Sequence, residues 1–272
     1  MTNSIEDVCE KSQVIFLIGS NPEEAHPVMG MRICRAVERG AKLIVADPRS
    51  IWLAGKADIH LKLAPGTNVA LLNGMVNAII REGLYDREFV ESRTEGFEEL
   101  KAAVADYTPE RVAEICGVDA RDIVSAARMY AQVDRASIVY CLGVVEHTTG
   151  TEGVMAISNL AMVAGKLGKP GCGVNPLRGQ NNVQGACDMG AGPADFTGYQ
   201  KVANPDARAK FEAAWGVALN TAPGLKATEC FPAMIDGRVK GLFLFGEDPV
   251  RTDPDTSHVI RALKSLDFLV VE

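Results

Sequence analysis

The residues best suited to bind a ligand lie in the stretch 171–190, which is rich in glycine and in hydrogen-bonding side chains. Glycine lets a backbone approach a ligand closely, and the amides around Arg178 supply donors at fixed offsets. Because its longest apolar run is two residues, the stretch has neither helical nor strand periodicity, and we expect a loop. A plain surface loop is the alternative. The density of hydrogen-bond donors instead favours a loop that forms part of a ligand-binding site.

Polar turns also follow the predicted strands. Residues 14–18 form an uninterrupted branched apolar run, a pattern typical of a strand buried on both faces, and the turn with Gly19 and Asn21 comes next. A helix to about Arg39 and a second buried strand at 43–46 complete a parallel βαβ unit. Ligands of such sheets bind beyond the carboxyl ends of the strands. The GxGxxG fingerprint is absent, which disfavours an ordinary nicotinamide-binding domain.

The end of the chain repeats its beginning. Residues 241–249 mirror residues 14–22, and each copy is followed by a predicted helix and a strand, at 42–46 and at 267–271. We therefore predict an α/β fold. A Rossmann-like lobe with a parallel sheet and helices on both faces occupies 1–180, and part of a second, related α/β lobe occupies 181–272. The helices of 84–135, with starts at Thr108 and Asp119, are expected to cover the first sheet.

Composition excludes several classes of function. The net charge of −7 argues against a nucleic-acid-binding surface, and no apolar run is long enough to cross a membrane. The seven cysteines are never closer than fifteen residues, so no zinc knuckle or iron–sulfur run is present. The four histidines are scattered and form no ligand set. Of these, His147 is expected to be a hydrogen-bonded loop residue rather than a base.

The fourteen residues 177–190, Leu-Arg-Gly-Gln-Asn-Asn-Val-Gln-Gly-Ala-Cys-Asp-Met-Gly, closely resemble a motif of the catalytic subunit of molybdenum- or tungsten-dependent formate dehydrogenases. Those enzymes belong to the molybdopterin oxidoreductase superfamily, and the resemblance extends from Val14 to Glu272. It implies oxidation of formate to CO₂ at a metal held by two molybdopterin guanine dinucleotides. It also implies that Arg178 orients formate, because a guanidinium holds a carboxylate through two parallel hydrogen bonds.

The resemblance further implies which residues contact the dinucleotides. A carboxylate such as that of Asp248 can accept from both N–H groups on the Watson–Crick edge of guanine. Glu146 stands where related enzymes often have glutamine, and its charge would repel phosphate. The implied cofactor contacts are Gly19, Asn21, Glu24, Asp47, Arg49, Gly66, Asn68, Leu142, Gly143, Glu146, Gln180, Gly246, Glu247, Asp248 and Thr252.

In the family, a [4Fe–4S] cluster and the cysteine or selenocysteine metal ligand lie upstream of such a segment, and another cofactor-binding domain lies downstream. The chain thus resembles an interior piece, expected to be inactive and free of cofactor by itself. Its expected partners are formate, the missing parts of the same subunit and electron-transfer subunits. No signal peptide is visible, which favours the cytoplasm while leaving export of a longer chain open. The alternatives are a nitrate reductase-like enzyme and a nucleotide-binding module without catalysis.

Overall fold

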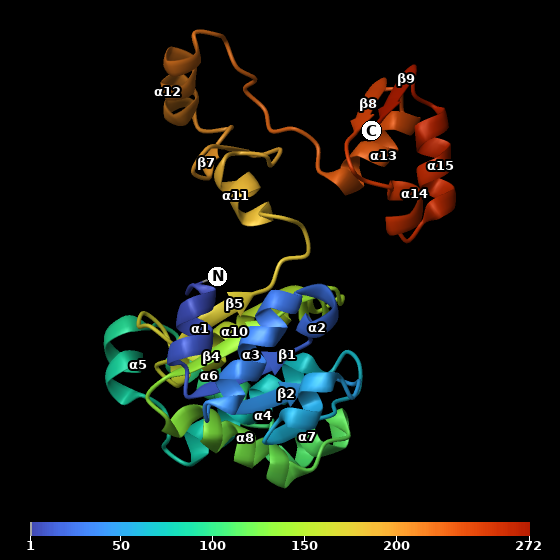
Figure 1. Cartoon of the computed structure of the whole chain (residues 1–272). Coiled ribbons are helices and arrows are strands. Elements are labelled where there is room, and N and C mark those ends of the chain that lie inside the picture. Colours follow the sequence, from blue (N-terminus) through green and yellow to red (C-terminus); the bar gives the residue numbers. More distant parts are fainter. Residues whose placement is uncertain (1) are drawn as a thin grey trace. The chain divides into compact units, whose positions relative to one another are not determined.

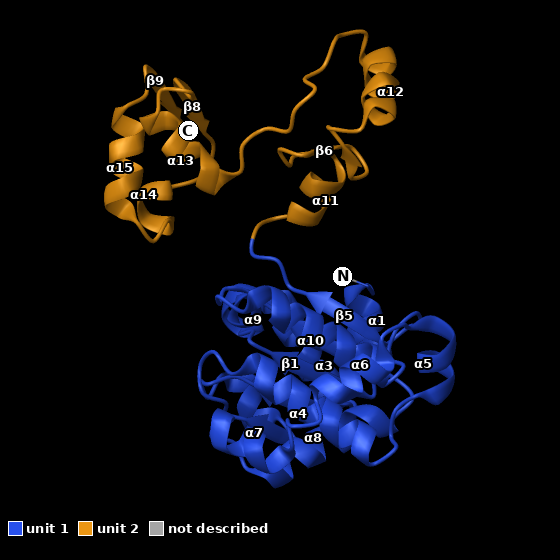
Figure 2. Ribbon diagram, turned by 180° about the vertical axis from the view of Figure 1, so that it is seen from behind, with its two compact units in different colours: residues 1–179 blue, residues 180–272 orange. Residues whose placement is uncertain are grey.

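The computed structural model describes residues 2–272, which divide after Gly179 into two compact units, called unit 1 and unit 2 (Figure 2). Unit 1 contains a five-stranded sheet with the order β3-β2-β1-β4-β5, and every neighbouring pair is parallel (Figure 1). Its strands are β1 (Val14–Ile18), β2 (Lys42–Ala46), β3 (Ile59–Leu61), β4 (Ala136–Tyr140) and β5 (Gly173–Pro176). The predicted parallel α/β fold is confirmed.

The strand order creates a switch point between β1 and β4. From β1 the chain moves outward to β2 and β3, and it then returns to place β4 on the other side of β1. The connections from β1 and from β4 therefore leave toward opposite edges of the sheet. A crevice forms at the carboxyl ends of two such strands, which is where open α/β sheets bind their ligands.

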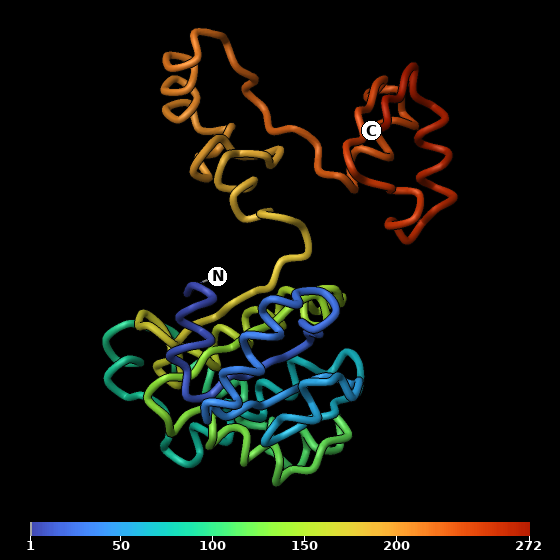
Figure 3. The backbone as a smooth tube through the Cα atoms, viewed as in Figure 1, coloured from blue at the N-terminus to red at the C-terminus, as the bar shows by residue number. Residues whose placement is uncertain are grey.

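Both faces of the sheet are covered by helices, as predicted. All five residues of β1 are buried, and their side chains alternate between two separate cores. Phe16 and its face pack against α4 (Asn68–Arg81), α7 (Pro109–Cys116), α8 (Ala120–Gln132) and α10 (Gly150–Val163). Ile15 and its face pack against α1 (Ile5–Lys11), α3 (Pro27–Glu38) and the 3₁₀ helix η1 (Trp52–Lys56). The backbone can be followed through these layers in Figure 3.

The remaining helices of unit 1 are short. The two predicted helix starts are confirmed, because the Thr108 and Asp119 side chains accept from the main-chain N–H groups of Arg111 and Arg121. The short helices are α2 (Pro22–Ala25), α5 (Arg87–Arg93), α6 (Phe97–Ala103) and α9 (Leu142–Val145). Across residues 2–272, no helix combines the length and the apolar character that a bilayer crossing demands.

Unit 2 contains two groups of elements. The first holds α11 (Val183–Asp188), a short antiparallel pair β6 (Asp195–Phe196) and β7 (Gln200–Lys201), and α12 (Pro205–Trp215). The second holds α13 (Ala227–Ile235), β8 (Gly241–Leu244), α14 (Pro249–Thr252), α15 (Thr256–Lys264) and β9 (Phe268–Val271). Strands β8 and β9 pair in parallel, with Leu244 opposite Val271.

The expectation of a loop throughout 171–190 is wrong. Residues 173–176 form the edge strand β5, and residues 183–188 form α11. Strand β5 contains Gly173 and Asn175, which have low strand propensity, so it depends on pairing with β4. The Asn175 side chain, fully buried, donates to the Ile138 carbonyl at 3.2 Å and adds to this pairing.

The predicted internal repeat is confirmed by the backbone. Each copy has a glycine with positive φ after its first strand, 56° at Gly19 and 64° at Gly246. The residue before each proline has nearly the same conformation, with φ −116° and ψ 80° at Asn21 and φ −125° and ψ 80° at Asp248. The glycine N–H also donates to a carbonyl of the second strand's end in each copy: to Ala46, the last residue of β2, and to Glu272, directly after β9.

Candidate functional site

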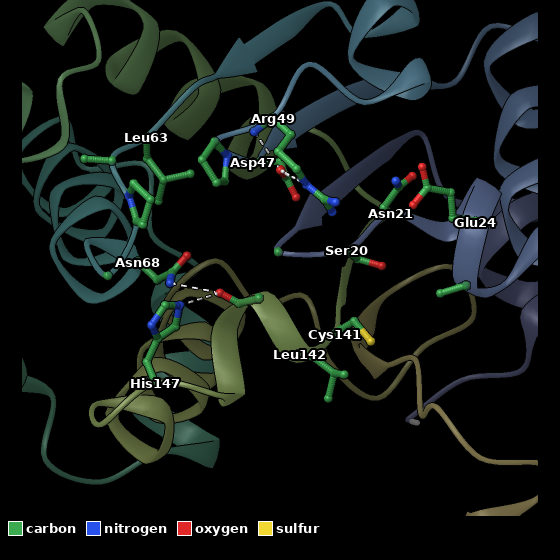
Figure 4. Close-up of a pocket in the computed structure, with 17 residues that line it drawn as sticks. Ser20, Asn21, Glu24, Asp47, Arg49, Leu63, Asn68, Cys141, Leu142 and His147 are labelled. Carbon is green, nitrogen blue, oxygen red and sulfur yellow. Dashed lines mark hydrogen bonds and ion pairs between the residues drawn. The ribbon is translucent and has the colours of Figure 1, made fainter. Parts of the chain in front are cut away.

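A cavity of about 310 Å³ lies at the carboxyl ends of β1, β2 and β4 (Figure 4). This is the switch-point crevice, and its volume is at the small end of ordinary ligand pockets, which span roughly 300–1,000 Å³. Its lining comes from four turns that are far apart in the sequence and one helix start. The lining residues are Gly19, Ser20, Asn21, Glu24, Ala25, Asp47, Pro48, Arg49, Leu63, Ala64, Pro65, Gly66, Asn68, Cys141, Leu142, Gly143 and His147.

Two glycines form the floor between β1 and β4. The Gly143 N–H donates to the Gly19 carbonyl at 3.0 Å. A Cβ atom on Gly19 would lie 2.6 Å from the Gly143 carbonyl carbon, and one on Gly143 would lie 2.7 Å from the Gly19 Cα. No side chain fits at either position without moving the opposing backbone. The two turns therefore meet through their main chains and leave the crevice above them open.

A buried carboxylate holds an exposed cation at the end of β2. The Asp47 side chain is 5% exposed, and its Oδ1 accepts from the Arg49 main-chain N–H at 2.8 Å. The Arg49 Nε lies 3.5 Å from the same oxygen, whereas its side chain is 64% exposed. Figure 4 shows this side chain among the lining residues, between Asp47 and Asn21, where its guanidinium can pair with an anionic ligand. Because the Arg49 side chain is largely in solvent, water weakens its pairing with Asp47 and leaves the guanidinium available.

Gly143 is also held by two side chains, that of Asn68 at the start of α4 and that of His147 four residues further along its own segment. Its carbonyl accepts from Asn68 Nδ2 at 3.2 Å and lies 3.1 Å from His147 Nε2 (Figure 4). Asn68 is the first residue of α4, a 14-residue helix with no acidic residue in its first turn. The amino end of such a helix carries partial positive charge and favours an anion nearby. The prediction that His147 is hydrogen-bonded is confirmed.

Two polar atoms of the crevice have no partner within the described part of the chain. They are Ser20 Oγ and Asn21 Oδ1, both shielded from solvent. Buried polar atoms of folded proteins are nearly always hydrogen-bonded, and an unpaired one costs about 1–3 kcal/mol. A ligand that carries both donors and acceptors would satisfy them. A nucleotide with its ribose hydroxyls and phosphate oxygens fits this requirement.

Nine of the residues expected from the sequence line this one cavity: Gly19, Asn21, Glu24, Asp47, Arg49, Gly66, Asn68, Leu142 and Gly143. Glu146 does not line it and follows the last residue of α9. Sequence reasoning missed Ser20 and Cys141. Ser20 lies between two residues that were chosen, so proximity was the available signal. Cys141 directly follows β4 and has no such signal in the sequence.

Arg178 lies at the end of unit 1, two residues after β5, and is exposed. Its positive charge acts on Tyr140, the last residue of β4. Burial raises the pKa of the Tyr140 phenol, and the Arg178 guanidinium opposes that rise. The other expected residues belong to unit 2, where Gln180 is exposed and where Gly246, Glu247, Asp248 and Thr252 form the second copy of the glycine turn.

Within residues 2–272, no group of three or more histidine, cysteine, aspartate or glutamate side chains is placed to hold a metal ion. Cys141 also lacks the features of a reactive thiol. Burial raises its pKa, and its Sγ lies 2.8 Å from the Leu177 carbonyl oxygen. The exposed Arg49 guanidinium, the amino end of α4 and the unpaired atoms of Ser20 and Asn21 suit a polar ligand that carries anionic groups.

Comparisons with known proteins agree with this chemistry. The family model for molybdopterin oxidoreductases matches residues 1–272. The chain is 54% identical to the F420-dependent formate dehydrogenase subunit alpha of Methanocaldococcus jannaschii, covering all of this chain and 40% of that protein. It is 46% identical to formate dehydrogenase H of Escherichia coli, covering all of this chain and 38% of that protein.

A comparison with solved structures also finds a match over nearly the whole chain. Acetylene hydratase from Pelobacter acetylenicus superposes with a TM-score of 0.74 at 26% identity, over 98% of this chain and 40% of that one. The chain thus spans about 40% of the length of these relatives. With a family match over its whole length and a switch-point crevice suited to a nucleotide, this chain belongs to the molybdopterin oxidoreductase family.

Proposed function

We propose that this chain is part of the catalytic subunit of a formate dehydrogenase, which oxidises formate to CO₂. The observation that carries the proposal is the convergence of nine residues expected from the family on one cavity at the switch point. Sequence identities of 54% and 46% to a formate dehydrogenase alpha subunit and to formate dehydrogenase H support formate as the substrate.

In this proposal the crevice of unit 1 holds one molybdopterin guanine dinucleotide. The Arg49 guanidinium and the amino end of α4 balance the diphosphate charge. Ser20 and Asn21 supply the unpaired polar atoms that a nucleotide satisfies. The turn around Asp248 in unit 2 repeats the geometry of the turn around Asn21, and we assign it to the second dinucleotide.

Arg178 is the residue that we assign to formate. Its guanidinium holds the carboxylate in one plane and stays positively charged while the substrate loses its hydrogen. When bound, the cofactor would supply molybdenum or tungsten, held by the two dinucleotides, as the acceptor of the two electrons. In the same proposal, the metal's cysteine or selenocysteine ligand and a [4Fe–4S] cluster lie in other parts of the subunit, electron-transfer subunits are partners, and the enzyme works in the cytoplasm.

A nitrate reductase-like enzyme is the second candidate, because family membership alone does not fix the substrate. The test is an assay of the complete subunit that carries this chain, loaded with cofactor and supplied with either formate or nitrate. We expect electron transfer from formate to an artificial acceptor and no reduction of nitrate. Turnover of nitrate without turnover of formate would overturn the proposed substrate, and turnover of neither would favour a binding module without catalysis.

A further inference from the structure

The carbonyl of Arg178 accepts a hydrogen bond from a distant histidine. His26 Nε2 lies 2.6 Å from the Arg178 carbonyl oxygen, and the two residues are 152 positions apart in the sequence. Because a carbonyl only accepts, Nε2 must carry the proton. The other ring nitrogen, Nδ1, is shielded from solvent and has no partner in the described part of the chain. The bond to Arg178 is thus the polar interaction that orients this imidazole.

The backbone of His26 is itself fixed. Its N–H donates to the Pro22 carbonyl at 2.9 Å, and its carbonyl accepts from the Gly30 N–H at 3.0 Å. It therefore joins α2 to α3, and Pro27 follows it as the first residue of α3. Because its main chain is fixed between two helices, the His26 imidazole is held in place as a hydrogen-bond donor.

The residue before Arg178 is held by β4. The Leu177 N–H donates to the Tyr140 carbonyl at 2.8 Å, and the Leu177 carbonyl lies 2.8 Å from Cys141 Sγ. Two consecutive carbonyls, those of Leu177 and Arg178, thus accept from side chains of two different loops. A Cβ atom built on the next residue, Gly179, would meet nothing within 4 Å.

The two donor loops are also walls of the switch-point cavity. Cys141 lines the cavity, and His26 directly follows Ala25, which lines it as well. We propose that His26 is a positioning residue for Arg178: it fixes the main chain from which the guanidinium projects and ties that position to the cofactor-binding loops. This inference rests on the proposed function, because it assigns a purpose to the placement of Arg178.

Three variants separate the hydrogen bond from other effects of the histidine. His26→Gln keeps an N–H donor at a similar reach, and His26→Leu keeps the bulk without a donor. His60→Leu is the matched control, because His60 Nε2 makes a similar contact, 3.0 Å from the Asp47 carbonyl, on another loop of unit 1.

Hydrogen exchange of this chain tests, without any substrate, whether the hydrogen bond from His26 holds the main chain at Arg178. We expect the Leu177 amide to exchange about tenfold faster in His26→Leu, at the upper end of what one lost hydrogen bond causes, and near the wild-type rate in His26→Gln. In His60→Leu its rate should not change. An unchanged rate in His26→Leu would overturn the inference, and so would equal acceleration in the Leu and Gln variants.

Kinetics of the complete, cofactor-loaded subunit test whether His26 positions Arg178 to bind formate. We expect His26→Leu to raise the KM for formate about tenfold at unchanged cofactor content, and His26→Gln to restore most of the affinity. A parallel loss of bound cofactor would assign His26 to the cofactor site and overturn the positioning role. If the wild-type subunit does not use formate, the proposed function fails, but the exchange result still tests the hydrogen bond. If His26→Leu has the formate kinetics of the wild type, the positioning role of His26 fails and the proposed function is unaffected.

Discussion

Gly19 and Gly143 meet through their main chains at the switch point, with the Gly143 N–H 3.0 Å from the Gly19 carbonyl oxygen. Gly19 directly follows β1, and Gly143 is the second residue of α9, which follows the neighbouring strand β4. Their contact fixes how closely the two turns approach, and it thereby sets the floor of the cavity. A site of this kind depends on backbone that no side chain can replace.

Replacement of Gly143 by alanine is expected to destabilise unit 1. The new Cβ atom would lie 2.7 Å from the Gly19 Cα, so the turns must separate. We expect the free energy of unfolding to fall by about 1–3 kcal/mol, as for other overpacked positions. Denaturant titration measures the change, and Gly55→Ala is the control because its Cβ atom would meet nothing within 4 Å. Equal stability of Gly143→Ala and wild type would contradict the close contact.

The sequence was sufficient to predict the parts of the fold that repeat or run without interruption. Buried strands such as 14–18 are visible as branched apolar runs, and the Gly-x-Asn-Pro and Gly-x-Asp-Pro turns identify the two related copies. The positions of Asp47 and Asn68 at the cavity follow from parallel strand pairing, because parallel strands bring their carboxyl ends to one edge.

The sequence was insufficient where tertiary pairing overrides local propensity. Strand β5 contains glycine, asparagine and proline, and it exists because β4 offers an unpaired edge. The bond between His26 and Arg178 had no local signal either, since it joins residues 152 positions apart. Such contacts become visible only once the fold places them together.

The start of α8 gives a prediction for acid. Hydrogen bonds from the Arg121 guanidinium and backbone lower the pKa of Asp119 from 3.8 to about 2. A carboxyl with a lowered pKa in the folded state stabilises the fold above its unfolded pKa, and this contribution is lost as pH falls toward about 2. Asp119→Asn keeps the cap without the charge. We expect the wild type to be the more stable at about pH 5 and the gap to close near pH 1.5. A gap that does not change with pH would contradict the assignment.

The β8–β9 pair exposes an unusual amount of apolar surface. Phe243, Phe268 and Val271 are 58%, 63% and 65% exposed. Exposed apolar strands recruit other chains, so we expect the purified chain to self-associate and to bind a hydrophobic dye. Val271→Thr should reduce both, because it makes the strand face more polar. Val217→Thr is the control, since Val217 is 56% exposed and lies outside any strand. Equal effects of the two variants would argue against the β8–β9 surface as the cause.

The assignment of formate to Arg178 is tested most directly by Arg178→Lys in the complete, cofactor-loaded subunit. Lysine keeps the charge but cannot form two parallel hydrogen bonds with a carboxylate. We expect kcat/KM for formate to fall about 10- to 100-fold at unchanged cofactor content. Arg111→Lys, at an arginine that is 60% exposed and paired with Asp106, should leave it unchanged. Retention of wild-type kcat/KM by Arg178→Lys would contradict the account.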